Sequence, residues 1–336
     1  MNITTLKHIH FTGIKGVGMT SLALCAKDLG IKVTGSDTDE LFVTDETLKK
    51  NGVSWKVGFS EKNLKPRPDL VITTGAHGGF QNPEVVAAKN LSIPVIPQAQ
   101  ALAEFAKEKD TLAVCGVGGK STVSAMIATI LDTASNSPSF AIGVGDIPSL
   151  GVPGKFDKDG KEFVCEADEF VVSPGIDDTP KFLLLSPKIA VVTNIEHDHP
   201  DVYPEIGDTK KAFRKFFQKI PQDGLLVAHT DNKNVTETIK ELDTPIQSYG
   251  MNPGVNWQIT NILFEEEKTL FSIKAKDGHT IDIVLQVPGE FNTLNATAAF
   301  IVGKQLGISD EKLVDGLRVY SGCRRRFEKI GEKNGI

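Results

Sequence analysis

A glycine-rich segment that ends in a lysine and two hydroxyl residues has the composition of a phosphate-binding loop. It lies between an apolar stretch and a helical pattern and reads Gly116-Val117-Gly118-Gly119-Lys120-Ser121-Thr122. Its glycines allow backbone N–H groups to point at a phosphate, and the N-terminus of the following helix adds positive potential. In such a loop Lys120 neutralises the β- and γ-phosphates of ATP, and the Ser121 hydroxyl is a ligand of Mg²⁺. The loop is shortened, because Val114 replaces the first glycine of the general pattern.

A second glycine-rich segment near the N-terminus also lies between a predicted strand and a predicted helix. It reads Gly13-Ile14-Lys15-Gly16-Val17-Gly18, and Asp37 stands at the end of the next predicted strand. In a dinucleotide-binding fold such glycines approach a pyrophosphate, and the acid binds a ribose hydroxyl. Lys15 occupies the position of the middle glycine, so the pattern does not by itself predict NAD. Two successive phosphate-binding loops predict two different nucleotides.

Acidic and imidazole side chains follow two further predicted strands. One group consists of Glu166, Asp168 and Glu169, and the other, over residues 196–201, contains His199 among acids. In an open α/β sheet, ligands bind beyond the carboxyl ends of the strands, so both groups are expected beside the nucleotide loop. Carboxylates and a neutral imidazole there can complete the shell of a divalent metal together with phosphate oxygens.

Short apolar strands alternate with helical patterns over most of the chain, which predicts βαβ units and a parallel sheet. The helix behind the first loop is predicted to end at Gly30, and a charged helical stretch is expected over residues 99–110. Alternating stretches between residues 257 and 287 predict an antiparallel meander. Strands are expected at residues 8–12, 32–35, 70–74, 93–97, 111–115, 163–165, 189–193 and 225–228.

These elements predict an α/β chain of two domains, the number that 336 residues suggest at about 150 residues per domain. An N-terminal Rossmann-like domain with a parallel sheet is expected over residues 1–107. A P-loop NTPase-like central domain with an added antiparallel sheet is expected over residues 108–328.

The composition narrows the classes of partner. A net charge of −6 argues against a nucleic-acid surface, which normally carries a basic excess. No window approaches the roughly 18 apolar residues of a membrane helix, and the polar start of the chain lacks the apolar core of a signal peptide. We therefore expect a cytoplasmic protein that binds small molecules, and neither nucleic acid nor a membrane. The cysteines are expected to be buried thiols rather than disulfides or zinc ligands, and they are Cys25, Cys115, Cys165 and Cys323.

Eight motifs occur in the order in which one enzyme family has them. They are GIKGVGM from residue 13, VTGSD at 33–37, NPEVVAA at 82–88, GVGGKST from 116, EADE from 166, TNIEHDH from 193, PGEFNTLNA at 288–296 and GCRRRFE at 322–328. On these motifs the chain resembles the Mur ligase family over essentially its whole length. The resemblance implies an ATP-dependent ligase of peptidoglycan synthesis, active as a monomer or homodimer. Such an enzyme joins L-alanine, or a recycled peptide, to UDP-N-acetylmuramate through an acyl phosphate.

The resemblance also implies which residues bind each ligand. ATP is held by residues 116–122, with adenine contacts from Asn292 and Asn295 and a phosphate contact from Arg326. The implied ligands of Mg²⁺ are Ser121, Glu166 and His199. The implied catalytic residues are Lys120, His199 and Arg326. The UDP part of the substrate is bound by Gly13, Lys15, Gly16, Val17, Gly18, Ser36 and Asp37.

Several positions depart from the family pattern. Val117 and Gly118 stand where family loops commonly read GTHGKT or GTNGKT, and Phe291 stands where alanine-adding members often have histidine. The segment EADEF, followed by DDTPKFLLLSP, is closer to the members that attach a tripeptide to the same UDP-sugar. These departures leave both L-alanine and a peptide as candidate amine substrates.

Three other functions fit parts of the pattern. The first loop and Asp37 suggest an NAD-dependent dehydrogenase, which leaves the Lys120 loop unexplained. A folylpolyglutamate synthase has a related P-loop, but the UDP-type N-terminal domain argues against it. A catalytically silent nucleotide-binding module is the third alternative. It is suggested because residues 329–336 read as the start of a linker to a C-terminal domain that the chain lacks, so we expect this chain alone to be a poor ligase.

Overall fold

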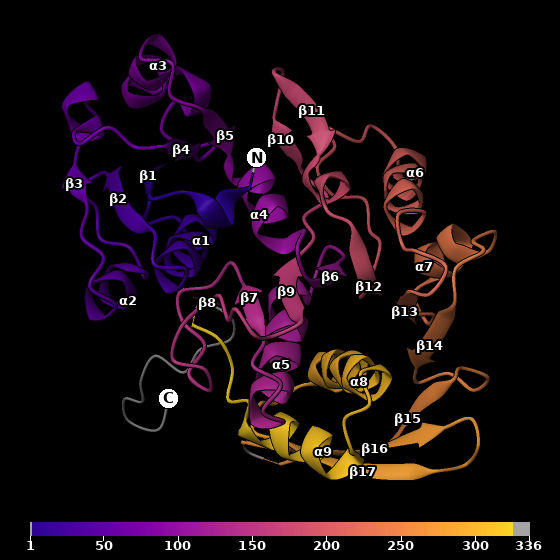
Figure 1. The fold of residues 1–336 in the computed structure, drawn as a ribbon. Coiled ribbons are helices and arrows are strands. Elements are labelled where there is room, and N and C mark those ends of the chain that lie inside the picture. Colours follow the sequence, from indigo (N-terminus) through magenta and orange to yellow (C-terminus); the bar gives the residue numbers. More distant parts are fainter. Residues whose placement is uncertain (1, 266, 325–336) are drawn as a thin grey trace, which may run out of the picture.

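A five-stranded sheet, parallel at every pairing, organises the N-terminal part of the chain (Figure 1). Its strand order is β3-β2-β1-β4-β5, and β1 (His8–Thr12) is central and buried along its whole length. The parallel sheet predicted for this region is therefore confirmed. The other elements are η1 (Ile3–Thr5), α1 (Val17–Asp28), β2 (Lys32–Asp37), α2 (Asp45–Lys50), β3 (Lys56–Val57), η2 (Glu61–Leu64), β4 (Leu70–Thr73), η3 (Gly79–Gln81), α3 (Pro83–Asn90), β5 (Val95–Pro97) and α4 (Gln98–Ala106).

A ten-stranded mixed sheet organises the rest, in the order β17-β16-β15-β14-β13-β12-β6-β9-β7-β8. The predicted meander is present, because β15, β16 and β17 pair antiparallel, and β14 joins them to the parallel strands in one continuous sheet. The strands are β6 (Asp110–Cys115), β7 (Ser139–Ala141), β8 (Gly154–Lys155), β9 (Glu162–Glu166), β12 (Pro187–Val192), β13 (Leu225–His229), β14 (Ile246–Gly250), β15 (Trp257–Phe264), β16 (Thr269–Ala275) and β17 (Thr280–Leu285).

Helix α5 (Lys120–Thr133) lies at the centre of the molecule because its sequence is apolar on more than one side. Val123, Ile127 and Ile130 are buried, and the helix packs against β9, α8 and α9 (Figure 1). The glycine-rich loop at its N-terminus is thereby fixed to the core of the larger sheet. The remaining elements are the β10 (Val171–Ser173) and β11 (Asp177–Pro180) hairpin, η4 (Lys181–Leu184), α6 (Ile206–Phe217), α7 (Lys233–Ile239), α8 (Glu290–Gln305) and α9 (Asp310–Val319).

The helix predicted over residues 99–110 is shorter in the structure. Helix α4 ends at Ala106, and Asp110 is already the first residue of strand β6. The charged residues that follow α4 do not continue the helix, because the Lys109 ammonium binds the carbonyls of Asp157 and Gly160 beside the sheet edge. The prediction was wrong there by about one turn of helix.

Helix α1 carries the contact between the two sheets. It packs on β7 and β8, where the Cys25 thiol donates to the carbonyl of Phe140 and the Asp28 carboxylate accepts from the N–H of Phe156 at 2.9 Å. Phe105 of α4 meets the same Phe156 ring at 6.3 Å between centroids. One hydrophobic cluster consequently runs from β1 and α1 into β6 and β9.

The computed structural model describes residues 2–265 and 267–324. Arg326, the end of the predicted central domain at residue 328 and the predicted linker over residues 329–336 lie outside this part of the chain. Within it, no helix is both long and apolar enough to cross a bilayer. The four cysteines are buried free thiols, as predicted.

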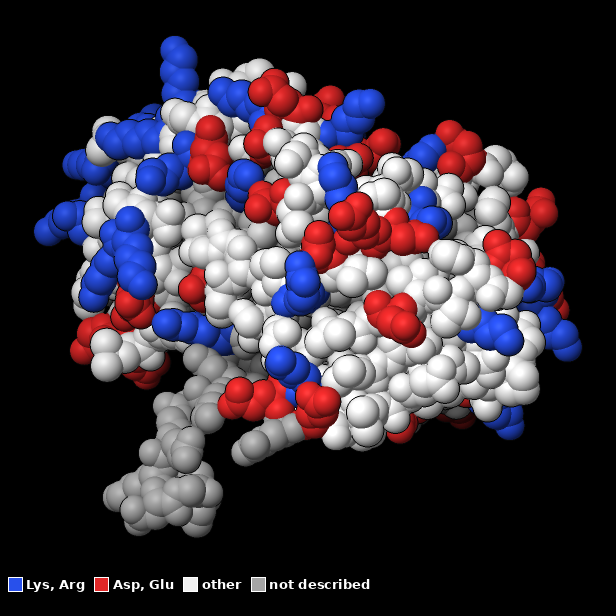
Figure 2. All heavy atoms as spheres, turned by 90° about the horizontal axis from the view of Figure 1, so that it is seen from below, with Lys and Arg blue, Asp and Glu red and all other residues white. Residues whose placement is uncertain are grey.

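Charged side chains of both signs are mixed on the face seen in Figure 2. Lys and Arg are most frequent over the N-terminal part, at the left, but Asp and Glu stand among them (Figure 2). This face therefore lacks the continuous basic stripe that is typical of nucleic-acid binding.

Candidate functional site

The glycine-rich loop joins β6 to α5, and backbone geometry explains its glycines. Gly116 and Gly119 have φ angles of +126° and +87°, which side-chain-bearing residues rarely adopt. The end of β12 holds the loop: the Thr193 hydroxyl donates to the Gly118 carbonyl at 2.5 Å, and the Asn194 side chain accepts from the Gly118 N–H at 3.0 Å. The loop and the predicted TNIEHDH segment therefore come together, as expected of strand ends in an open sheet.

This geometry predicts the effect of a single methyl group. A Cβ at position 116 would lie 2.2 Å from Thr193 Oγ1 and 2.8 Å from the Asn194 carbonyl oxygen. We expect Gly116→Ala to destabilise the fold by about 1–3 kcal/mol and to remove nucleotide binding, because the residue keeps a strained φ or displaces the loop. Urea unfolding measures the loss. Gly118→Ala is the matched control, since its Cβ would meet its nearest neighbour, Asn194 Nδ2, at 3.4 Å. Equal losses in the two variants would contradict this account of the loop.

The ammonium of Lys120 folds back toward the start of its own glycine-rich loop. It donates to the Gly116 carbonyl at 2.6 Å and to the two carboxylate oxygens of Glu169 at 3.0 and 3.3 Å. Glu169 is 2% exposed, and burial raises its pKa while the Lys120 charge limits the rise. The cation predicted to meet the phosphates thus rests against a buried acid.

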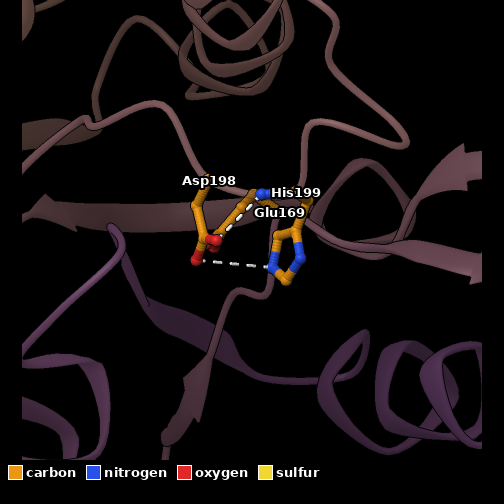
Figure 3. A group of neighbouring side chains, drawn as sticks. All are labelled: Glu169, Asp198 and His199. Atoms are coloured by element: carbon orange, nitrogen blue, oxygen red, sulfur yellow. Dashed lines mark hydrogen bonds and ion pairs between the residues drawn. The ribbon is translucent and has the colours of Figure 1, made fainter.

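Two of the three predicted metal ligands are joined by a hydrogen bond. The Ser121 hydroxyl donates to Glu166 Oε2 at 2.8 Å, and the other carboxylate oxygen of Glu166 accepts from the Gly143 N–H at 2.7 Å. A hydroxyl and a carboxylate next to a phosphate loop are the hard oxygen donors that suit Mg²⁺. His199 lies in a second group, which includes Glu169 (Figure 3).

The second group consists of Glu169, Asp198 and His199, with one ligand atom of each lying within 4.8 Å of the others (Figure 3). His199 Nε2 is 3.6 Å from Asp198 Oδ2, and its ring packs on that of Phe170 at 4.6 Å between centroids. The sequence had marked both acidic segments, and the structure brings Glu169 of the first together with Asp198 and His199 of the second. That His199 joins Ser121 and Glu166 around a metal stays a prediction.

A cavity of about 520 Å³ opens beside the loop, large enough for a nucleoside. Asn292 and Asn295, the predicted adenine contacts, line it and are joined by a hydrogen bond of 3.3 Å. His229 and Tyr249 also line it, with rings stacked at 5.3 Å between centroids. Sequence reasoning missed this pair, because the two residues lie on separate strands and no motif joins them. Phe291, half exposed, lies at the same wall.

Three side chains that were predicted to bind the UDP part of the substrate lie inside the N-terminal part of the chain. One belongs to the first glycine-rich loop and two to the end of β2. Lys15 is 1% exposed, and its ammonium binds the carbonyl of Glu40 and lies 3.7 Å from Asp45. The Asp37 carboxylate accepts the N–H of Lys15 at 2.7 Å and is itself fully buried. Ser36 donates to a buried acid, Glu84, at 2.5 Å. Each of these three side chains therefore already has an internal partner, and their contact with a ligand stays a prediction.

A second cavity, of about 410 Å³, lies between the two sheets and touches both glycine-rich loops. Val17 and Gly18, at the N-terminus of α1, line one side. Lys120 and Glu166 line the other. Backbone N–H groups at a helix N-terminus attract phosphate, so an anionic ligand that begins at α1 can extend to the P-loop lysine within one cavity.

A P-loop beside a nucleoside-sized cavity, with a second cavity leading to another helix N-terminus, defines an ATP-dependent enzyme with a separate anionic substrate. The pattern described as the Mur ligase family, catalytic domain, matches residues 8–110, and that of the Mur ligase middle domain matches residues 114–303. The chain belongs to the Mur ligase family, the ATP-dependent amino-acid ligases of peptidoglycan and cell-wall synthesis. The resemblance seen in the eight motifs and the α/β fold class are thus confirmed, and the dehydrogenase alternative is set aside.

Relatives of two kinds are similar to the chain. The UDP-N-acetylmuramate--L-alanine ligase of Thiobacillus denitrificans is 37% identical over 97% of this chain and 68% of the relative. That of Geotalea daltonii is 38% identical over 98% and 69%. Among solved structures, the UDP-N-acetylmuramate:L-alanyl-gamma-D-glutamyl-meso-diaminopimelate ligase of Neisseria meningitides has a TM-score of 0.82 at 27% identity, covering 96% of this chain and all of that one. The UDP-N-acetylmuramate-alanine ligase of Thermotoga maritima has a TM-score of 0.81 at 26% identity, covering 98% and 72%.

Proposed function

We propose that this protein joins an amine substrate to the muramyl carboxylate of UDP-N-acetylmuramate, with ATP as the source of energy. One observation carries the proposal: a single cavity is lined by Gly18 at the N-terminus of α1 and by Lys120 of the P-loop. A UDP-sugar whose pyrophosphate lies at α1 would place its sugar in this cavity and its carboxylate toward the γ-phosphate. The two domains of the proposal are residues 1–107 and 108–328, since α4 ends at Ala106 and β6 begins at Asp110.

The proposed roles follow from the positions of the side chains. Residues 116–122 hold the triphosphate, and the cavity with Asn292 and Asn295 holds the adenine. Ser121, Glu166 and His199 would hold Mg²⁺, which when bound neutralises phosphate charge. Lys120 leaves Glu169 for the phosphates and stabilises the charge of the transferring phosphoryl group. The muramyl carboxylate attacks the γ-phosphorus, ADP leaves, and the amine then displaces phosphate from the acyl phosphate.

The amine substrate is proposed as L-alanine or a peptide, because relatives of both kinds match the chain. The test is phosphate release together with mass-spectrometric detection of the product, using UDP-N-acetylmuramate, MgATP and either L-alanine or the tripeptide L-Ala-γ-D-Glu-meso-diaminopimelate. A ligated product with one amine supports the proposal and selects the substrate. Binding of both nucleotides without any product would favour the catalytically silent module.

The N-terminal part is expected to bind UDP-N-acetylmuramate and not NADH. To bind the ribose of NADH, the Asp37 carboxylate would have to face the ligand. It is instead fully buried and accepts hydrogen bonds from the backbone N–H groups of Lys15 and Thr38, at 2.7 and 2.8 Å. Calorimetric titration of the whole chain with each ligand makes the comparison. Saturable heat with NADH and none with the UDP-sugar would contradict this assignment of the first loop.

A further inference from the structure

Lys181 is a second lysine at the cavity between the two glycine-rich loops. It follows the β10–β11 hairpin and is the first residue of η4. Its N–H donates to the Phe170 carbonyl at 2.9 Å, and its ammonium lies 5.2 Å from the centroid of the Phe170 ring. The ammonium also donates to Asp168 Oδ2 at 2.8 Å. Backbone, ring and carboxylate contacts thus hold this side chain at the cavity wall.

The negative charges around the cavity call for a second cation to bind the substrate carboxylate. Two acids, Glu166 and Asp168, and two lysines, Lys120 and Lys181, line it among the described residues. In the proposed reaction Lys120 is committed to the triphosphate, so the approaching muramyl carboxylate meets like charge from both the phosphates and the acids. An ammonium has three N–H donors, and Asp168 accepts one from Lys181, so the group can bind a second carboxylate without leaving its partner.

The geometry places both lysines at the same cavity. Lys120 and Lys181 line it together, and the hydrogen bond to Asp168 Oδ2 holds the Lys181 ammonium at its wall.

We propose that Lys181 binds the lactyl carboxylate of the acyl donor and selects UDP-N-acetylmuramate over UDP-sugars that lack this group. The inference rests on the proposed function and adds a specificity-determining residue to it. UDP-N-acetylglucosamine is the informative comparison, because it is the same molecule without the lactyl ether and its carboxylate. The alternative role for Lys181 is a purely structural ion pair with Asp168.

The test measures the dissociation constants of both UDP-sugars, by calorimetry on the whole chain, for the wild type and three variants. Lys181→Met removes the charge, and Lys181→Arg retains a cation for both carboxylates. Lys188→Met is the matched control, because Lys188 also pairs with a carboxylate, Asp223 at 2.6 Å, but lies near the start of β12, away from the cavity. Loss of a charge-assisted hydrogen bond predicts that Lys181→Met weakens UDP-N-acetylmuramate by about 10- to 100-fold and leaves UDP-N-acetylglucosamine nearly unchanged.

The outcomes separate the two proposals. Collapse of the preference in Lys181→Met, with most of it kept in Lys181→Arg and all of it in Lys188→Met, supports the carboxylate site. An unchanged preference in Lys181→Met, or equal weakening of both UDP-sugars, overturns it and leaves a structural ion pair. If Lys181→Met does not fold, Lys181→Gln, which also removes the charge but keeps an N–H donor for Asp168, takes its place, and an unchanged preference in Lys181→Gln overturns the carboxylate site as well. A wild type that binds neither UDP-sugar overturns the proposed function and this inference with it.

Discussion

Replacing Lys120 with alanine is expected to abolish the stabilisation of the protein by MgATP. At a ligand concentration 100 times the dissociation constant, ATP should add about 2.7 kcal/mol to the wild type and nothing measurable to the variant. The reason is positional: the ammonium lies against the Gly116 carbonyl, in the loop whose N–H groups face the phosphates. Loss of this charge should also slow phosphate release by about 100- to 1000-fold.

Thermal melts of each protein with and without MgATP provide the measurement. Each variant is compared with its own ligand-free form, because Lys120→Ala also leaves the buried Glu169 without its cation and so changes the starting stability. Lys211→Ala is a suitable control, since Lys211 is exposed on α6 and its one ion pair among the described residues is with the nearby Asp208. An equal MgATP shift in wild type and Lys120→Ala would remove the P-loop assignment.

Glu84→Gln is expected to cost about 3–5 kcal/mol of folding free energy, because it disrupts a buried network of hydrogen bonds to a carboxylate. The Glu84 carboxylate is fully buried and accepts hydrogen bonds from five groups. An amide would turn one acceptor into a donor that faces other donors. The five groups, from β1, β2 and the region of η2, are His10 Nε2, Thr12 Oγ1, Ser36 Oγ, Ser60 N–H and Asn63 Nδ2.

The same carboxylate predicts part of the acid sensitivity. Burial alone would raise the pKa of Glu84, but hydrogen bonds from His10 and Ser36 lower it below the ordinary value. A carboxyl whose pKa is lower in the folded than in the unfolded protein stabilises the fold at pH values above its unfolded pKa, which is about 4.3 for Glu. This stabilisation is lost as the pH falls from there through the pKa of the folded protein. Urea unfolding from pH 7 to pH 3 should therefore show a flatter acid limb in Glu84→Gln. Glu61→Gln, at an exposed position nearby, should match the wild type; a wild-type-like Glu84→Gln would refute the network.

The glycine-rich loops could be predicted from the sequence because their chemistry is local. Gly116 to Thr122 follows one strand and opens one helix, so a short window contains the signal. The grouping of side chains from distant segments could not be predicted in the same way. The grouping of Glu169 with His199 was not predicted, because no spacing in the sequence states how far the chain turns after β9. His229 and Tyr249 meet only because β13 and β14 are neighbours in register.

Lys15 shows that a short motif does not determine where a side chain points. The resemblance placed it among the residues that bind the UDP part of the substrate. The structure turns the side chain toward Phe42 and Trp55, with the ammonium 4.7 and 5.5 Å from the ring centroids. Aromatic faces and a backbone carbonyl from residues 40–55 attract the cation. These groups could not be foreseen from the motif, because it covers only residues 13–18.

The packing of α1 on β7 and β8 determines whether the chain can be divided into fragments that fold independently. A fragment cut after α4 would leave the Cys25 thiol without the Phe140 carbonyl and Phe105 without the cover of Phe156, and the complementary fragment would expose the Phe156 ring. Newly exposed apolar surface of this kind favours aggregation over independent folding. In the proposed function each glycine-rich loop binds its own ligand, whereas the two parts of the chain share the apolar burial that stabilises them. Swapping either part between relatives would therefore require that the α1 face and the β7–β8 face be exchanged together.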